Sequence, residues 1–268
     1  DEEGLGDEGV SFDKALVDTQ EAFYQCMVEV ADGSSAVKRT LLTDIRRLCM
    51  FFGRQRTNDF LLPLVSTFLN LRDRELEVSF LENIVDVSAF VGMTSLEFCI
   101  LPLTEDALYN SEEVVVAKAV AALGRLADLG LFRKHVLFDL ARKVAPLFVH
   151  PNVWIRYGTV SAVVAIAQQL IAGNGGNTAI VSSSNSEANS PTALTPATTP
   201  PPGVGARLDL FVFLLPTIRP YLLCNISEVT ESTLSQVLQP PCSRPTYQRA
   251  LVVAKQLRGT APPEQQQL

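Results

Sequence analysis

Apolar residues recur along this chain with the three- to four-residue spacing of amphipathic helices. The clearest faces are formed by Leu76, Phe80, Ile84 and Val87, and by Val116, Val120, Leu123 and Ala127. Similar patterns occupy residues 12–31, 37–52 and about 244–258. An alternation of apolar and polar positions, typical of a strand, never extends over more than a few residues. The pattern therefore predicts an all-α protein.

A short aliphatic-Leu-Pro signature marks an internal repeat. It occurs as LLP at 61–63, as ILP at 100–102 and as LLP at 214–216. Pro63 and Pro102 are 39 residues apart, and Pro216 follows Pro102 by 114 residues, close to three such periods. This spacing leaves room for a copy without proline near Leu140 and for one period of inserted sequence. Paired helices with a period near 40 residues, the first helix of each pair bent at proline, predict a HEAT-type α-solenoid of stacked helical hairpins.

The predicted solenoid covers residues 12–258. Residues 1–11 are expected to form an acidic disordered tail, because the first thirteen residues hold six acids and no base. Residues 171–206 consist mainly of Gly, Ser, Thr, Asn and Pro with almost no charge, which predicts a disordered loop inserted in the array. Residues 259–268 are expected to link this region to a following domain.

Composition argues against several classes of function. Beyond the acidic start, 22 bases face 23 acids, so the chain lacks the broad basic field that nucleic-acid binding needs. The five cysteines form no Cys-x-x-Cys pair, the two histidines have no zinc-like spacing, and no glycine-rich stretch has the form of a phosphate loop. We therefore expect no metal and no cofactor. Two glutamines interrupt the longest apolar run, so no direct membrane span is expected.

The densest candidate site is HPNVWIRYG, residues 150–158, which contains the only tryptophan of the chain. The repeat places HPN in the turn between two paired helices, with Pro151 at or near the first turn of the second helix. We expect Trp154 to pack between neighbouring repeats and Arg156 to bond turn carbonyls or a nearby acid. The alternative is that Trp154 or Arg156 is a hot spot for a partner. Catalysis is not expected, because no second histidine or acid is positioned to act with His150.

A second candidate is basic. Residues 38–56 hold six bases and a single acid. Arg46 and Arg47 fall opposite the apolar stripe of their helix, and Arg54 and Arg56 are expected in the turn that follows. These four arginines form either a solvated helix face or a patch for an acidic partner surface, with anionic lipid as a lesser variant of the second interpretation. No aromatic residues are interleaved for base stacking, so single-stranded nucleic acid is not expected.

Two of these stretches carry a family resemblance. LCMFFGRQRTNDFLLPLVSTFLN, residues 48–70, and HPNVWIRYG resemble the helical-repeat region of the regulatory, protein-kinase-like subunit of the class III phosphatidylinositol 3-kinase complex. The resemblance covers residues 36–170 well and the last repeats weakly. The loop at 171–206 and the acidic start depart from it. In that family the full protein has an N-terminal kinase-like domain, this solenoid and a C-terminal β-propeller.

The resemblance implies that this chain is a non-catalytic scaffold segment joining the kinase-like and propeller parts. The Val-Ala-x-Lys, His-Arg-Asp and Asp-Phe-Gly signatures of a protein kinase do not occur in it. The implied partners are the lipid kinase catalytic subunit and Beclin-type, coiled-coil subunits. The implied location is cytoplasmic, peripheral on endosomal and autophagic membranes. Two alternatives remain: a HEAT-type adaptor of another assembly, such as a phosphatase scaffold or transport receptor, and an all-helical enzyme.

Overall fold

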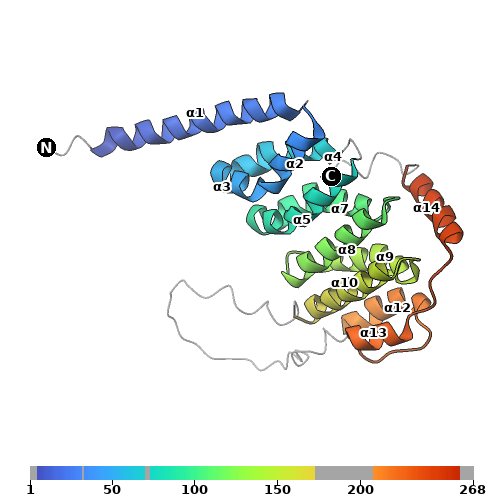
Figure 1. Cartoon of the computed structure of the whole chain (residues 1–268). Coiled ribbons are helices and arrows are strands. Elements are labelled where there is room, and N and C mark those ends of the chain that lie inside the picture. Colours follow the sequence, from blue (N-terminus) through green and yellow to red (C-terminus); the bar gives the residue numbers. More distant parts are fainter. Residues whose placement is uncertain (1–4, 32, 70–72, 173–207, 260–268) are drawn as a thin grey trace, which may run out of the picture. The chain divides into compact units, whose positions relative to one another are not determined.

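The computed structural model describes residues 5–31, 33–69, 73–172 and 208–259 (Figure 1). Within these ranges every named element is a helix, and the sole strand-like feature is one isolated antiparallel bridge between Leu222 and Leu238. The predicted all-α fold is therefore confirmed for the described residues. The chain divides into two compact units, Asp1–Leu126 and Ala127–Leu268, which are described in turn. The predicted extent of the solenoid, residues 12–258, stays a prediction.

Three predicted boundaries change or stay untested. The first helix begins at Leu5, so residues 5–11 belong to a helix and not to the expected acidic tail. The predicted inserted loop, 171–206, lies outside the described residues except for its first two positions, which end a helix. Of the predicted linker, only residue 259 is described, again as the end of a helix.

Unit 1 is a succession of helices joined by short turns. Its elements are α1 (Leu5–Ala31), α2 (Ser35–Thr43), α3 (Ile45–Arg56), the π-helical turn η1 (Thr57–Leu61), α4 (Leu62–Leu69), α5 (Arg74–Val91), α6 (Met93–Ser95), the π-helical turn η2 (Leu96–Ile100), α7 (Leu101–Ala107) and α8 (Glu113–Asp128), whose last two residues belong to unit 2. Helix α5 packs against α2, α3 and α4, and α1 contacts α2 and α4 (Figure 1). The buried side chains between them include Leu42, Ile45, Phe68, Leu76 and Ile84.

Glycines with positive φ recur with the period of the helical repeat. Gly53, Gly92 and Gly130 have φ values of 74°, 94° and 67°, and they follow one another at intervals of 39 and 38 residues. Gly53 kinks α3 into two helical segments, Gly92 separates α5 from α6, and Gly130 lies in the turn after α8. Glycine occurs at these positions because a residue without a Cβ enters this conformation without strain. Residues 54–56, expected in a turn, therefore already belong to the following helix.

The repeated prolines are accommodated by widened helical turns. Pro63 follows η1, Pro102 follows η2, and Pro216 follows the π-helical turn at Leu210–Leu214. Proline lacks an N–H group and its ring would clash with the carbonyl four residues earlier, so a wider turn lets the helix continue past it. The predicted bend at each Leu-Pro signature thus takes the form of a π turn rather than a break.

Exposed ion pairs connect the second helices of successive hairpins in unit 1. Lys118 Nζ lies 2.8 Å from Glu82 Oε1, joining α8 to α5, and Arg39 pairs with Glu75, joining α2 to α5. Arg74 Nη1 lies 4.0 Å from Glu112 Oε2, just before α8. Because these pairs are exposed, each contributes at most about 1 kcal/mol to stability. They align neighbouring hairpins, while the buried apolar side chains supply most of the stabilisation.

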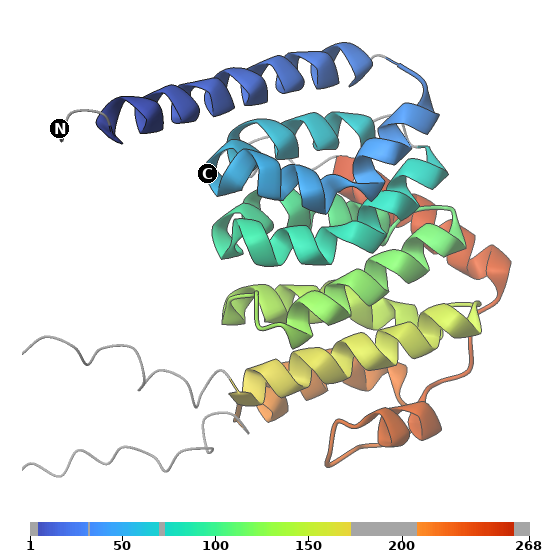
Figure 2. The same ribbon diagram turned by 60° about the vertical axis from the view of Figure 1, so that its left-hand side comes forward.

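Unit 2 is built around one long helix. Its elements are α9 (Lys134–Val144), the 3-10 turn η3 (Ala145–Val149), α10 (Val153–Ala172), η4 (Leu210–Leu214), α12 (Leu215–Ile218), the 3-10 turn η5 (Arg219–Tyr221), α13 (Glu231–Val237) and α14 (Arg244–Gly259). Helix α10, yellow in Figure 2, packs against α9, α13 and η4. The Phe138 and Phe213 rings lie 4.5 Å apart between centroids, and they join α9 to η4.

Helix α10 is apolar for most of its length. It is the one helix among the described residues that is long and apolar enough to cross a membrane by length and composition, and half of its most apolar stretch is buried inside the structure. This finding differs from the expectation that no segment would qualify. The core helix of a packed domain has the same composition, and the ten buried residues of α10 account for its apolar character.

Candidate partner-binding surface

The turn before α10 is a hydrogen-bonded junction. His150 is buried, and its Nδ1 accepts a hydrogen bond of 2.9 Å from the backbone N–H of Asn152. The Asn152 Oδ1 in turn accepts a hydrogen bond of 2.8 Å from the backbone N–H of Trp154. This hydrogen bond caps the start of α10. The His150 ring also meets the Tyr247 ring of α14 edge-on, at 4.3 Å between centroids. These contacts give His150 a structural role at the helix start.

Arg156 ties this junction to the last part of the chain. Its Nε donates to the Phe148 carbonyl at 2.8 Å, and one terminal nitrogen donates to the Gln239 carbonyl at 2.8 Å. The nearby Cys242 N–H donates to the Val149 carbonyl, so residues 239–242 are held against the turn from both sides. The expectation that Arg156 bonds turn carbonyls is confirmed. A role for it in partner binding remains a prediction.

Replacing Arg156 by methionine is expected to lower the free energy of unfolding by about 1.5–3 kcal/mol. Methionine keeps an apolar stem but removes both charged donors from the carbonyls of Phe148 and Gln239. Urea denaturation of Arg156→Met measures the change. The matched control is Arg142→Met, which removes only an exposed ion pair between Arg142 and Asp139, both on α9. This change should lower the free energy of unfolding by less than about 0.5 kcal/mol. Equal losses in the two variants would contradict this role for Arg156.

Trp154 does not lie in the core. Its side chain is 77% exposed, and Tyr157 one turn later is 53% exposed, whereas Ile155 between them is fully buried. The expectation that Trp154 packs between repeats is therefore wrong. Because α10 is apolar on nearly every side, periodicity could not tell which face is buried, and the size of the tryptophan suggested the wrong one. A large exposed aromatic side chain fits the alternative interpretation, a contact for a partner.

The basic candidates do not gather into one patch of free cations. Arg46 pairs with Asp86 of α5 at 3.0 Å, and Arg47 pairs with Asp44 at 3.1 Å. Both arginines are exposed, as expected. Arg56, only 26% exposed, lies 4.0 Å from Glu21 of α1. Since an acid of the chain itself stands beside each of these arginines, the interpretation as a structural helix face gains support. Their role in binding an acidic partner stays a prediction.

Arg54 acts as a cap for a neighbouring helix. Its Nε donates to the Val91 carbonyl, the last of α5, at 3.0 Å, beside the positive-φ Gly92. Gln169 repeats this arrangement in unit 2, where its amide donates to the Asp128 carbonyl at 3.1 Å beside Gly130. Neither contact was predicted from the sequence. The signal that would have revealed them is the regular spacing of the three glycines, which marks where helix carbonyls need partners.

Chemistry-bearing side chains are sparse in the part of the chain that the structure describes. No group of three or more His, Cys, Asp or Glu side chains there is arranged to hold a metal ion. Cys49 is buried, and burial raises the pKa of its thiol. The features that stand out are instead the exposed Trp154 and Tyr157 on α10, which we name the aromatic pair.

Comparison with known proteins assigns the chain to a family. The family model described as "PIK3R4-like, middle domain" matches residues 1–174. A probable serine/threonine-protein kinase vps15 of Dictyostelium discoideum is 36% identical over 250 residues, which is 89% of this chain and 11% of that protein. Serine/threonine-protein kinase VPS15 of Arabidopsis thaliana is 33% identical over 214 residues, 80% of this chain and 12% of that protein.

A yeast relative shows the same relationship over a shorter range. Serine/threonine-protein kinase VPS15 of Saccharomyces cerevisiae is 40% identical over 141 residues, 53% of this chain and 10% of that protein. The chain thus spans about a tenth of the length of these relatives. The family match includes residues 48–70 and HPNVWIRYG, the two stretches that carry the resemblance. By this match the chain belongs to the PIK3R4-like middle-domain family.

Proposed function

We propose that this chain is a non-catalytic helical scaffold segment of a regulatory subunit of the class III phosphatidylinositol 3-kinase complex. In this role it joins a kinase-like part to a propeller part and supports assembly of the lipid kinase with Beclin-type, coiled-coil subunits. The complex works in autophagy and in endosomal and vacuolar sorting, in the cytoplasm and peripherally on membranes. Membership of the PIK3R4-like family and the names of the VPS15 relatives support this proposal.

The aromatic pair is the observation that carries the binding part of this proposal. A scaffold of HEAT-type hairpins buries one side of each helix against its neighbours and leaves the other side for partners. Helix α10 follows this division, because ten of its residues are buried while Trp154 and Tyr157 remain more than half exposed. Aromatic side chains of this kind supply much of the binding energy of protein interfaces.

Co-purification of the lipid kinase catalytic subunit with the full-length regulatory subunit tests the proposal. Replacing both members of the aromatic pair by alanine is expected to reduce the recovered catalytic subunit by about tenfold or more, the loss typical of a hot spot. The control is Met50→Ala, a 69% exposed apolar residue in unit 1. A full-length protein that never associates with the lipid kinase would contradict the proposal outright.

A further inference from the structure

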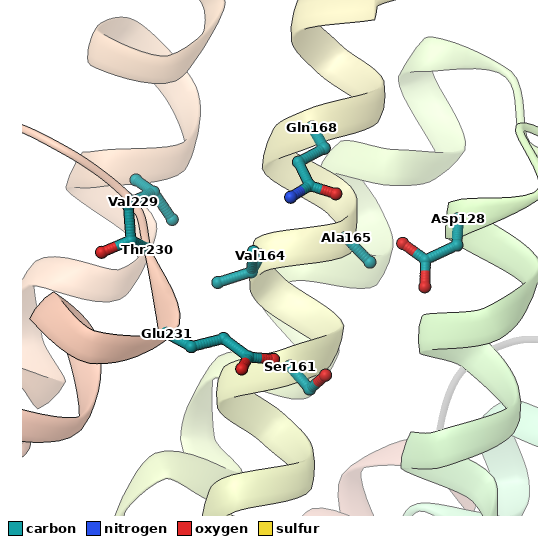
Figure 3. Close-up of a pocket in the computed structure, with 8 residues that line it drawn as sticks. All are labelled: Asp128, Ser161, Val164, Ala165, Gln168, Val229, Thr230 and Glu231. Atoms are coloured by element: carbon teal, nitrogen blue, oxygen red, sulfur yellow. The ribbon is translucent and has the colours of Figure 1, made fainter.

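A pocket of about 360 Å³ lies in unit 2, beside helix α10 (Figure 3). It is bounded by the end of α8 on one side and by the start of α13 on the other. Val164 and Ala165 of α10 are buried and, with Val229, make its apolar surface. The pocket is shallow and open, which suits a side chain inserted by another protein better than an enclosed small molecule.

Two carboxylates stand at the sides of this apolar surface. Asp128 is the last residue of α8 and Glu231 the first of α13, and Figure 3 shows both side chains extending toward α10. Neither carboxylate has an ion pair or a side-chain hydrogen bond with the described residues. The Ser161 hydroxyl and the Gln168 amide add polar groups at the edge.

This combination of groups selects a particular chemistry. An apolar surface flanked by two carboxylates fits a long aliphatic stem that ends in a cation, as in lysine and arginine. The same carboxylates repel phosphate, so a nucleic acid or an anionic membrane surface is disfavoured. The complementary ligand is therefore a basic side chain of a protein.

The pocket continues the face of α10 that carries the aromatic pair. At 100° per residue, Trp154, Tyr157, Ser161 and Gln168 lie within a stripe of about 60°. From Tyr157 to the middle of the pocket at Val164 the helix rises roughly 10 Å. A partner helix spans that distance in about seven residues, and an extended segment spans it in about three.

We propose that this pocket binds a lysine or arginine side chain of a subunit of the lipid kinase assembly. The same partner segment places an apolar side chain on the aromatic pair, seven residues away if helical or three if extended. This assignment rests on the proposed function, since it names the part of a partner that the scaffold holds. Helix α10 would thus recognise two features of one partner segment: an apolar side chain and a basic side chain at a fixed distance from it.

Photo-crosslinking of the intact assembly tests this proposal. A photo-crosslinking amino acid at Ser161 of the full-length protein is activated in the purified complex, and the attached peptide is identified by mass spectrometry. We expect a peptide of another subunit that contains a lysine or arginine with an apolar residue at the stated spacing. Asp128→Asn with Glu231→Gln should lower the adduct yield by about tenfold or more. Asp18→Asn with Glu29→Gln, which removes two charges from exposed positions of α1, should leave the yield unchanged.

A charge exchange completes the test. Asp128→Lys with Glu231→Lys should abolish the adduct, and changing the identified base of the partner to glutamate should restore it. An intact assembly that gives no adduct, an adduct within the same chain, or an attached segment without a base would overturn the pocket assignment while leaving the proposed function standing. Failure of the assembly to form at all would instead remove the proposed function and this inference with it.

Discussion

Replacing Ile155 by alanine is expected to lower the free energy of unfolding by about 2–5 kcal/mol, the range for truncating a fully buried aliphatic side chain. The adjacent change Trp154→Ala removes a larger side chain, yet it should alter that free energy by less than about 0.5 kcal/mol. The reason is position, because Ile155 has no exposed surface and Trp154 is 77% exposed. Ile155 therefore contributes to stability, whereas its neighbour Trp154 is available for binding.

Urea denaturation of the two variants, followed by far-ultraviolet circular dichroism, measures both changes. The midpoint should fall sharply for Ile155→Ala and stay near that of the unchanged protein for Trp154→Ala. A large loss of stability in Trp154→Ala would show that the ring is buried in solution. That result would support the expectation from the sequence that Trp154 packs between neighbouring repeats.

Replacing Gly92 by alanine is expected to destabilise the protein by about 2–4 kcal/mol. Gly92 has a φ of 94° and a ψ of 171°, a conformation that residues with a Cβ avoid. A Cβ at this position would also clash with a terminal nitrogen of Arg54. The end of the arginine side chain would have to move, which would weaken its Nε hydrogen bond to the Val91 carbonyl.

Gly53→Ala is the matched control for this prediction. Gly53 has a similar backbone conformation, with a φ of 74° and a ψ of 170°, but no atom lies within 4 Å of the added Cβ. Its replacement should therefore cost only the backbone strain, about 1–3 kcal/mol. In a protein that already carries Arg54→Ala, the cost of Gly92→Ala should drop to this level. An unchanged cost would mean that the contact between Arg54 and Gly92 contributes nothing.

The helices of this fold were predictable because their apolar faces have a regular spacing. The Leu-Pro signatures at Pro63 and Pro102 gave the correct period, since proline forces a local change in helix geometry wherever it occurs. The residues at which helices start were predicted less accurately. Arg54 and Arg56 were expected in a turn and lie in a helix, because a sequence does not show that the single positive-φ Gly53 can replace a turn of several residues.

The binding surface was only half predictable. The composition of HPNVWIRYG drew attention to Trp154, and the carbonyl contacts of Arg156 were expected. The exposure of Trp154 was not, because α10 is apolar on almost all sides and its amphipathic pattern is weak. The pocket was beyond sequence reasoning altogether. Asp128 and Glu231 are more than 100 residues apart in the chain and line one pocket only because α13 packs on α10.

The central claim is that the exposed face of α10 is a contact surface of a scaffold in the lipid kinase assembly. Hydroxyl-radical footprinting of Trp154 and Tyr157 tests it most directly, because the oxidation rate of a side chain follows its exposure to water. In the isolated full-length protein we predict rapid oxidation of both side chains, and in the complete assembly a rate several-fold lower for both. Equal oxidation rates with and without the other subunits would contradict the claim.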